Sequence, residues 1–325
     1  MSIFSRIAAP AVALGVALAS PAVAQVKIAL DSPADLQTSG TYVWVHAFGQ
    51  VLADAGMSVE EFERGSLGNE EERIDQVSQG LLEVSLSDVK AAGALDPTIM
   101  AIMLPYFFED TAQLDHALLE GGMLEHINGN TTPKGVRVLD IAFIGGGAGI
   151  FNTEHPVNTV ADLADLRMRA LDQVQIAIFG AWGTQGTIVA WDEVPNALQT
   201  GVANGYVNPP IVPLMFGHTN FIKYFTDAEL VPSSRAIVAS EAWYSGLSDE
   251  EKATVEAAVV AGRAANREWL GGQGAVIDQL VAAGIEVTTL TPEARAEFRA
   301  ASLPVYGLLP LPEGALDAWT AALGN

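Results

Sequence analysis

The sequence predicts an α/β fold made of two hinge-linked lobes with a long helix between them. Strand and helix patterns alternate from residue 26 to residue 86, which is typical of a parallel sheet with crossover helices. The chain has 325 residues, which is more than one ordinary domain needs. A helical pattern over residues 249–271 is long enough to connect two such lobes.

The first 24 residues have the features of a signal peptide. Arg6 provides a positive start, residues 7–19 are small and apolar, and Ala22-Val23-Ala24 forms a small-x-small cleavage site. The alternative is a membrane anchor, but the apolar run is shorter than the roughly 20 residues that span a bilayer. A lipoprotein anchor requires Cys, which the chain lacks. We therefore expect cleavage after Ala24 and export.

The next elements follow in strict alternation. Apolar alternation predicts strands at 26–30, 57–62 and 82–86, and helical spacing predicts helices at 41–55 and 70–80. The second helix begins with consecutive acidic residues, which suit the positive end of a helix dipole. These five elements form the expected sheet of the first lobe.

A run of glycines ends the following strand, predicted over residues 136–143. No GK[ST] motif follows Gly145-Gly146-Gly147, so a phosphate-binding loop is disfavoured. Glycine occurs where the backbone must bend unusually or approach another segment closely. We therefore expect a hinge or a close backbone approach at these residues.

The remaining chain repeats the α/β alternation. Acidic residues near the predicted helix starts, such as Asp192, are interpreted as caps. The expected elements are a helix start at Thr159, strands at 166–170, 186–190, 236–240 and 286–290, and helices at 176–182, 192–202, 249–271 and from 291 onward.

The elements group into two lobes after the signal peptide. We expect lobe I to comprise residues 25–145 and approximately 236–275. Lobe II is then expected to comprise residues 146–235 and approximately 276–325. Ligands of such folds bind at strand ends or between lobes.

The charge of the chain excludes one class of partner. The formal net charge is −23, and removal of residues 1–24, whose only charged side chain is Arg6, makes it −24. Nucleic-acid binding requires clustered Lys and Arg to neutralise phosphates, so a nucleic-acid partner is not expected. An anionic ligand would need nearby cationic side chains to overcome repulsion by the negative charge of the protein.

Enzyme chemistry has little support in the sequence. The chain has no Cys and no G-x-S-x-G motif, and its five His show no metal-binding spacing. Paired carboxylates such as Asp31 with Asp35, and Glu70 to Glu72, lie near predicted helix starts, where they complement the dipole. We therefore expect no catalytic site, no metal and no cofactor.

Binding chemistry has better support. Arg169 lies in an otherwise apolar strand, where a guanidinium could hold a ligand carboxylate or form a structural salt bridge. Asn208 precedes two prolines that stiffen it, and it could bind a ligand oxygen or be an ordinary turn residue. Trp191, Tyr206 and Phe216 could wall a pocket or pack in the core.

Several blocks of the sequence carry a resemblance to a known family. The most specific is W-D-E-V-P-N-A-L-Q-T-G-V-A-N-G-Y-V-N-P, residues 191–209. Supporting blocks are G-S-L-G-N-E (65–70), G-L-L-E-V-S (80–85), L-P-Y-F-F-E-D (104–110), V-A-D-L-A-D-L-R-M-R (160–169) and residues 243–248. The chain resembles the extracytoplasmic substrate-binding subunit of tripartite ATP-independent periplasmic (TRAP) transporters, DctP type, over essentially the whole mature length.

The resemblance implies a periplasmic binding protein fold, location in the periplasm and a role in transport. The expected ligand is a small organic acid, delivered to the small and large membrane subunits of a TRAP permease, and we expect a monomer. By resemblance, Arg169 pairs with the ligand carboxylate and Asn208 hydrogen-bonds it. Trp191 packs on the ligand, and Asp88 reaches into the cleft from the first lobe.

Two departures from the family pattern bear on the ligand. Many members carry a second arginine in the turn that here contains Ala148 and Gly149, and a Glu or Gln where this chain has Val207. The site is therefore expected to be less cationic and less polar than usual, which favours a monocarboxylate and disfavours a bound cation. The alternatives are a neutral or zwitterionic solute, or a receptor that serves signalling.

Overall fold

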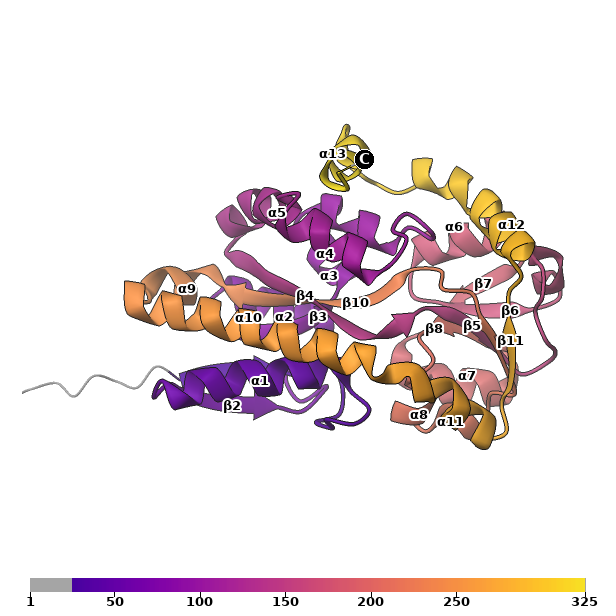
Figure 1. Ribbon diagram of the computed structural model, residues 1–325, viewed down its shortest axis with the longest axis horizontal. Coiled ribbons are helices and arrows are strands. Elements are labelled where there is room, and N and C mark those ends of the chain that lie inside the picture. The colour runs from indigo at the N-terminus through magenta and orange to yellow at the C-terminus, as the bar shows by residue number, and fades with distance from the viewer. Residues whose placement is uncertain (1–24, 325) are drawn as a thin grey trace, which may run out of the picture.

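Two β-sheets, one in each lobe, organise the chain. The computed structural model describes residues 25–324, so the predicted signal peptide, 1–24, lies outside the described residues. The two lobes lie side by side along the longest axis (Figure 1). This two-lobed α/β architecture is the predicted fold.

The lobe I sheet combines early strands with one late strand. Strands β1 and β2, and β1 and β3, pair in parallel, while β10 lies antiparallel between β3 and β4. Residues 84–87 of β3 and 236–240 of β10 are buried without a break, as expected for strands that are covered on both faces. In spatial order the strands are β2 (Ser58–Phe62), β1 (Gln25–Ala29), β3 (Val84–Asp88), β10 (Pro232–Ser240) and β4 (Val136–Gly147).

The lobe II sheet is mixed. Strand β6 pairs in parallel with β7 and β8, and β5 lies antiparallel between β8 and β9. In spatial order the strands are β11 (Glu286–Thr289), β9 (Tyr224–Asp227), β5 (Gly149–Asn152), β8 (Gly205–Asn208), β6 (Arg167–Ala170) and β7 (Gln185–Ile188).

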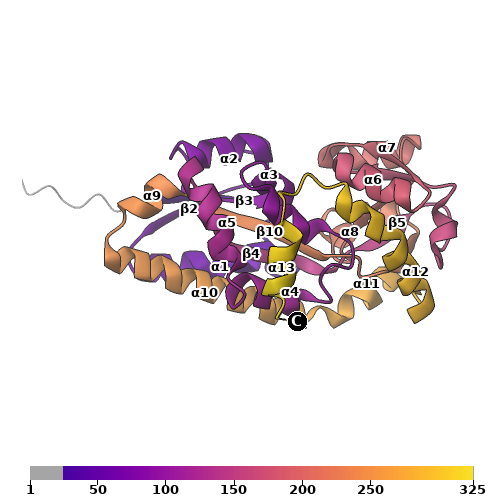
Figure 2. The same cartoon turned by 90° about the horizontal axis from the view of Figure 1, so that it is seen from above.

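Helices cover both sheets, and the view from above separates the two groups (Figure 2). Those of lobe I are α1 (Gly40–Asp54), α2 (Glu70–Ser78), α3 (Val89–Gly93), α4 (Thr111–Leu119), α5 (Met123–Thr131), α9 (Glu241–Gly246), α10 (Asp249–Gly271) and α13 (Ala315–Ala322). Those of lobe II are α6 (Gln173–Ala181), α7 (Val194–Thr200), α8 (Val212–Met215), α11 (Val276–Ala282) and α12 (Pro292–Ser302).

Short 3₁₀ turns connect several of these elements. They are η1 (Pro97–Met103), η2 (Thr132–Lys134), η3 (Val160–Leu163), η4 (Trp191–Glu193), η5 (His218–Asn220), η6 (Gln273–Ala275) and η7 (Leu303–Gly307).

The long helix α10 has the predicted bounds. A capping box starts it, in which the Ser248 hydroxyl accepts from the N–H of Glu251 and the Glu251 carboxylate accepts from the N–H of Ser248. The helix lies along lobe I against α1, and its far end leads into α11 of lobe II (Figure 1). No helix among residues 25–324 is both long and apolar enough to cross a membrane.

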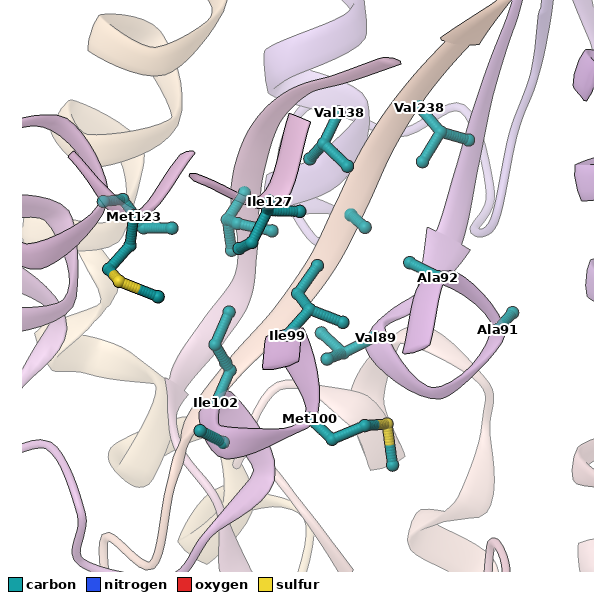
Figure 3. Packing of buried hydrophobic residues seen from close by; sticks show 14 of the residues in the cluster. Val89, Ala91, Ala92, Ile99, Met100, Ile102, Met123, Ile127, Val138 and Val238 are labelled. Atoms are coloured by element: carbon teal, nitrogen blue, oxygen red, sulfur yellow. The ribbon is translucent and has the colours of Figure 1, made fainter. Parts of the chain in front are cut away.

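One apolar core of lobe I lies between its sheet and the helices α3, η1 and α5 (Figure 3). Side chains from these helices meet side chains of β4 and β10, and their burial removes apolar surface from water. The labelled members are Val89, Ala91, Ala92, Ile99, Met100, Ile102, Met123, Ile127, Val138 and Val238.

The C-terminal end differs from the expected lobe assignment. Residues 276–325 were expected in lobe II, but α13 packs on η1, α4 and α5 of lobe I. The Trp319 indole donates to the Thr98 carbonyl at 2.8 Å, and its ring packs edge-on against Phe108. Trp319 and Ala322, on the apolar face of α13, are buried in the lobe I core, and this explains the correction.

Two local predictions are also wrong. The helix expected over residues 192–202 begins as the 3₁₀ turn η4, and α7 starts only at Val194. Asp192 therefore caps nothing. It pairs instead with Arg64 of lobe I, with 2.6 Å between Oδ1 and Nη1. The alternative that Asn208 is an ordinary turn residue is also wrong, because Asn208 is the last residue of strand β8.

Candidate functional site

A cavity of about 190 Å³ lies between the two lobes. Of the predicted ligand-binding residues, Asp88, Arg169, Trp191, Asn208 and Phe216 line it. Much of the remaining lining is apolar, and these side chains include Ile102, Met103, Ile178, Phe179, Val212 and Met215. The arrangement combines a few polar groups with a largely apolar wall, which is typical of small-molecule sites.

Arg169 is held on β6 with its charge unpaired. The side chain is only 7% exposed, and its Nε donates to the Val189 carbonyl at 2.9 Å. Within residues 25–324 no carboxylate lies within ion-pair distance of its guanidinium, so the structural salt bridge is not found there. Burial, and then the nearby Arg235, lower its pKa to about 10, so it stays charged at neutral pH. Its Nη1 and Nη2 are available to an anion.

Asn208 lies on β8, the strand next to β6. Its Nδ2 is buried and has no hydrogen-bond partner among the described residues. Arg169 is in register with Tyr206, and side chains two residues apart share a face of a strand, so Arg169 and Asn208 project from the same face. A buried donor without a partner costs free energy, and a ligand oxygen would satisfy it.

Tyr206 itself does not line the cavity. It is fully buried behind Trp191, with ring centroids 6.0 Å apart, and its hydroxyl lies 3.5 Å from Nδ1 of His218. Burial raises the pKa of its phenol, which remains protonated. Tyr206 therefore has a supporting position, packed against Trp191, which itself lines the cavity.

Trp191 and Phe216 form an aromatic wall beside Arg169. Their rings meet edge to face with centroids 5.1 Å apart, and the Arg169 guanidinium lies 5.6 Å from the Trp191 ring. From lobe I, Arg64 reaches across to lie 5.9 Å from the Phe216 ring while it pairs with Asp192. We call Arg169, Trp191 and Asn208 the lobe II wall.

The opposite side, which we call the lobe I wall, consists of Asp31, Glu70, Asp88 and Arg235. Arg235 on β10 is in register with Asp88 on β3, and its Nε donates to Oδ2 of Asp31 at 3.0 Å. The backbone N–H of Asp88 donates to Oε2 of Glu70 at 2.6 Å. The Asp88 carboxylate also caps α3 by accepting from the N–H of Ala91.

The ionisation of the lobe I wall follows from this crowding. Burial and then the Glu70 charge raise the pKa of Asp88 to about 7. Burial opposes ionisation of Glu70 too, but Arg235 and the hydrogen bonds from Asp88 hold its pKa below the usual value. Arg235 keeps a raised pKa despite its burial, because Glu70, Asp31 and Asp88 surround it.

Two arginines that the sequence analysis did not identify also lie at the cavity. Arg64 and Arg235 line the cavity together with Arg169, although each of the two pairs with a carboxylate. Arg235 directly precedes the apolar run Ala236–Ala239, and the predicted strand began one residue after it. Glu70 was interpreted only as a helix-start residue.

The glycine segment lies at the junction of the lobes. Strand β4 continues through Gly147, and a Cβ at Gly147 would come within 2.9 Å of the Glu229 backbone. A Cβ at Gly149 would collide with the Phe225 ring and the Thr226 carbonyl. The backbone of residues 147–149 therefore lies so close to residues 225–229 that glycine is required here. This agrees with the predicted close backbone approach.

Residues 33–308 match the family described as bacterial extracellular solute-binding protein, family 7, or DctP. The chain belongs to this family.

Within residues 25–324, no group of three or more His, Asp or Glu side chains is arranged to hold a metal ion.

Several DctP-family proteins are similar over most of their length. The C4-dicarboxylate-binding periplasmic protein DctP of Rhodobacter capsulatus is 25% identical over 306 residues, covering 91% of this chain and 90% of that protein. The ectoine/5-hydroxyectoine-binding periplasmic protein UehA of Ruegeria pomeroyi is 25% identical over 304 residues, covering 90% and 88%.

A solved structure gives the same result. A TRAP periplasmic solute-binding protein from Bordetella bronchispeptica, with density interpreted as pantoate, superposes with a TM-score of 0.80 at 25% identity. The match covers 91% of this chain and 98% of that one. This chain is thus a TRAP-type solute-binding protein of the DctP family, and the relatives named above are solute-binding proteins.

Proposed function

We propose that this protein captures a small monocarboxylate in the periplasm and delivers it to the small and large membrane subunits of a TRAP permease. The observation that carries the proposal is the lobe II wall, where a buried, unpaired guanidinium and a buried, unpartnered amide project from the same face. Two such donors suit the two oxygens of one carboxylate.

The body of the ligand is expected to be partly apolar. Aliphatic and aromatic side chains from both lobes surround the donors, among them Met103, Phe179 and Met215. The proposed order of events is docking on the lobe II wall, followed by closure of lobe I over the ligand. Asp88 and Arg64 then complete the enclosure, and no covalent bond changes.

A zwitterionic solute is the second candidate. The observation that favours it is the pair of carboxyl groups, Glu70 and Asp88, on the side of the cavity opposite Arg169. The similar protein UehA carries ectoine in its name. Such a ligand would place its carboxylate on the lobe II wall and its cationic group toward lobe I.

The test begins with a thermal-shift screen of carboxylates, amino acids and polyols, because a compound that binds the native state raises its melting temperature. Calorimetry on the acid with the largest shift then compares Arg169→Ala with wild type. We expect a loss of at least about tenfold, ~1.4 kcal/mol.

The matched control is Arg167→Ala. Arg167 lies two residues away on β6, is exposed and donates to the Gly201 carbonyl, so its removal should leave affinity unchanged. Unchanged affinity in Arg169→Ala, with the fold intact, would overturn the assigned carboxylate site.

A further inference from the structure

The Glu70–Asp88 pair faces Arg169 across the same cavity. The pair is tightly coupled, because the Asp88 N–H donates to the Glu70 carboxylate and the two carboxyl groups also interact through their side chains. Asp88 contributes an attractive charge to Arg169. The cavity therefore has an unpaired cation on the lobe II side, and on the lobe I side it has the acidic pair with Arg235 beside it, which also acts on Arg169.

The charges around Asp88 nearly cancel. Helix α2 contributes Glu70 and Arg73, β10 contributes Arg235, and Asp31 follows β1. Lys90 on α3 is exposed and pairs with Glu71 away from the cavity. Asp31, Glu70 and Asp88 thus share two guanidinium groups, Arg73 and Arg235, so full ionisation of these five groups leaves one excess negative charge, and one shared proton makes them neutral. Arg64, the other lobe I arginine at the cavity, also acts on Arg73 but pairs with Asp192.

We infer that the Glu70–Asp88 pair determines specificity at the far end of the ligand. It excludes a second carboxylate there and favours a cationic or hydrogen-bond-donating group. This inference rests on the proposed function, since it takes the ligand carboxylate to bind Arg169 and Asn208. The substrate class is a monocarboxylate with a far end that is not anionic, and an ω-amino acid is the best fit.

The physical reason is the cost of like charges in a confined site. A carboxylate held near an ionised pair meets direct repulsion and loses its hydration, whereas an ammonium or hydroxyl group replaces water with a carboxylate acceptor. Repulsion of this kind discriminates between ligands by weakening the binding of the wrong one. The similar protein from Rhodobacter capsulatus carries C4-dicarboxylate binding in its name, so specificity at this end would separate the two proteins.

The inference also predicts how ligand affinity depends on pH, because ligand binding and protonation of Asp88 affect each other. Burial and then Glu70 raise the pKa of Asp88 to about 7, so this carboxyl group is ionised above that pH and protonated below it. An ammonium at the far end binds better when Asp88 is ionised, and a second carboxylate binds better when it is protonated. Lowering the pH from about 8 to about 6.5 should therefore weaken an ω-amino acid and strengthen a dicarboxylate.

The experiment compares three matched series of probes: unbranched monocarboxylates, dicarboxylates and ω-amino acids with four, five or six carbons. Their affinities are measured by calorimetry and by NMR titration of tryptophan indole signals, which detects millimolar binding. At about pH 8 we expect the best dicarboxylate to bind at least about tenfold more weakly than the ω-amino acid of the same length.

Two variants remove the charge and keep the hydrogen bonds. Asp88→Asn can still cap α3, and Glu70→Gln can still accept from the Asp88 N–H. Each single variant should reduce the discrimination against dicarboxylates several-fold, and the double variant should abolish or reverse it. Glu71→Gln, on an exposed site of the same helix, is the matched control and should change nothing.

The possible outcomes distinguish a failure of this inference from a failure of the proposed function on which it rests. Dicarboxylates that bind as well as ω-amino acids, with binding that still depends on Arg169, would overturn the specificity role alone. The same conclusion would follow from an unchanged preference in the double variant. Binding that does not depend on Arg169, or no binding by any probe, would overturn the carboxylate site and this inference with it.

Discussion

The lobe I wall and the lobe II wall satisfy their polar groups in different ways. On the lobe I wall, Arg235 pairs with Asp31 and the Asp88 backbone donates to Glu70, so these groups hold one another. On the lobe II wall, Arg169 has no ion-pair partner and Asn208 Nδ2 has no acceptor among the described residues. This difference supports the proposed order, in which lobe II holds the ligand first and lobe I then closes over it.

The largest expected effect is on stability, and it tests whether the paired charges of the lobe I wall stabilise the fold. Asp31→Ala removes the partner of Arg235 and the acceptor of the Thr41 hydroxyl. Arg235 then loses the carboxylate that accepts its Nε hydrogen bond and keeps only Glu70 and Asp88 nearby, so we expect a loss of about 3 kcal/mol in the free energy of unfolding. Chemical denaturation followed by tryptophan fluorescence measures this loss.

Asp35→Ala is the control for Asp31→Ala, because Asp35 is an exposed carboxylate four residues further along the chain. It should cost far less stability. A loss below about 1 kcal/mol in Asp31→Ala would show that the lobe I charges do not depend on one another.

The next prediction concerns the lobe II wall, where a substitution is expected to increase stability instead of reducing it. Arg169→Met removes a buried charge that has no carboxylate partner among the described residues and substitutes a flexible apolar side chain. Without ligand we expect the protein to gain about 1 kcal/mol of stability, since burial of an unpaired charge opposes folding. Differential scanning calorimetry of the ligand-free protein measures it.

Arg235→Met provides the comparison with Arg169→Met. It should destabilise the protein, because three carboxyl groups lose the guanidinium that they share. If both arginine variants lost stability equally, the distinction between paired and unpaired walls would be wrong.

The smallest effect concerns the contact that joins the two walls. Arg64→Gln breaks the pair with Asp192, whose side chain is 78% exposed, so the contribution is about 0.5 kcal/mol. We expect roughly a twofold loss of affinity for the acid found in the thermal-shift screen, and the loss should disappear at about 1 M salt. Calorimetry at low and high salt measures both.

A double-mutant cycle isolates the Arg64–Asp192 pair. Asp192→Asn should have the same effect as Arg64→Gln, and the two changes together should cost no more than either alone. Additive losses would instead assign Arg64 a separate role, through its contact with Phe216.

The sequence predicted the parts of the fold and site that depend on local pattern. Helix α10 has a capping box and a long periodic stretch, and its bounds are as predicted. Arg169 is visible as a charge in an apolar strand, and its role as a carboxylate ligand came from the family resemblance. That role remains a prediction.

The parts of the fold and site that the sequence did not predict depend on contacts between segments far apart in the chain. Arg235 meets Asp88 only because β10 inserts between β3 and β4, in a register that no local pattern reveals. The same holds for α13, whose apolar face gives no indication of which lobe covers it. Strand β8 is only four residues long and was hidden by the turn residues before it.

The return of the C-terminus to lobe I sets a mechanical limit on the protein. Val305 of η7 is buried in a lobe II core, whereas Leu309 is buried in the lobe I core that also holds Trp319 of α13. The four residues from Val305 to Leu309 extend to about 14 Å at most. These two points cannot separate further unless Leu309 leaves the lobe I core, so we expect this crossing to limit how far the two lobes can open.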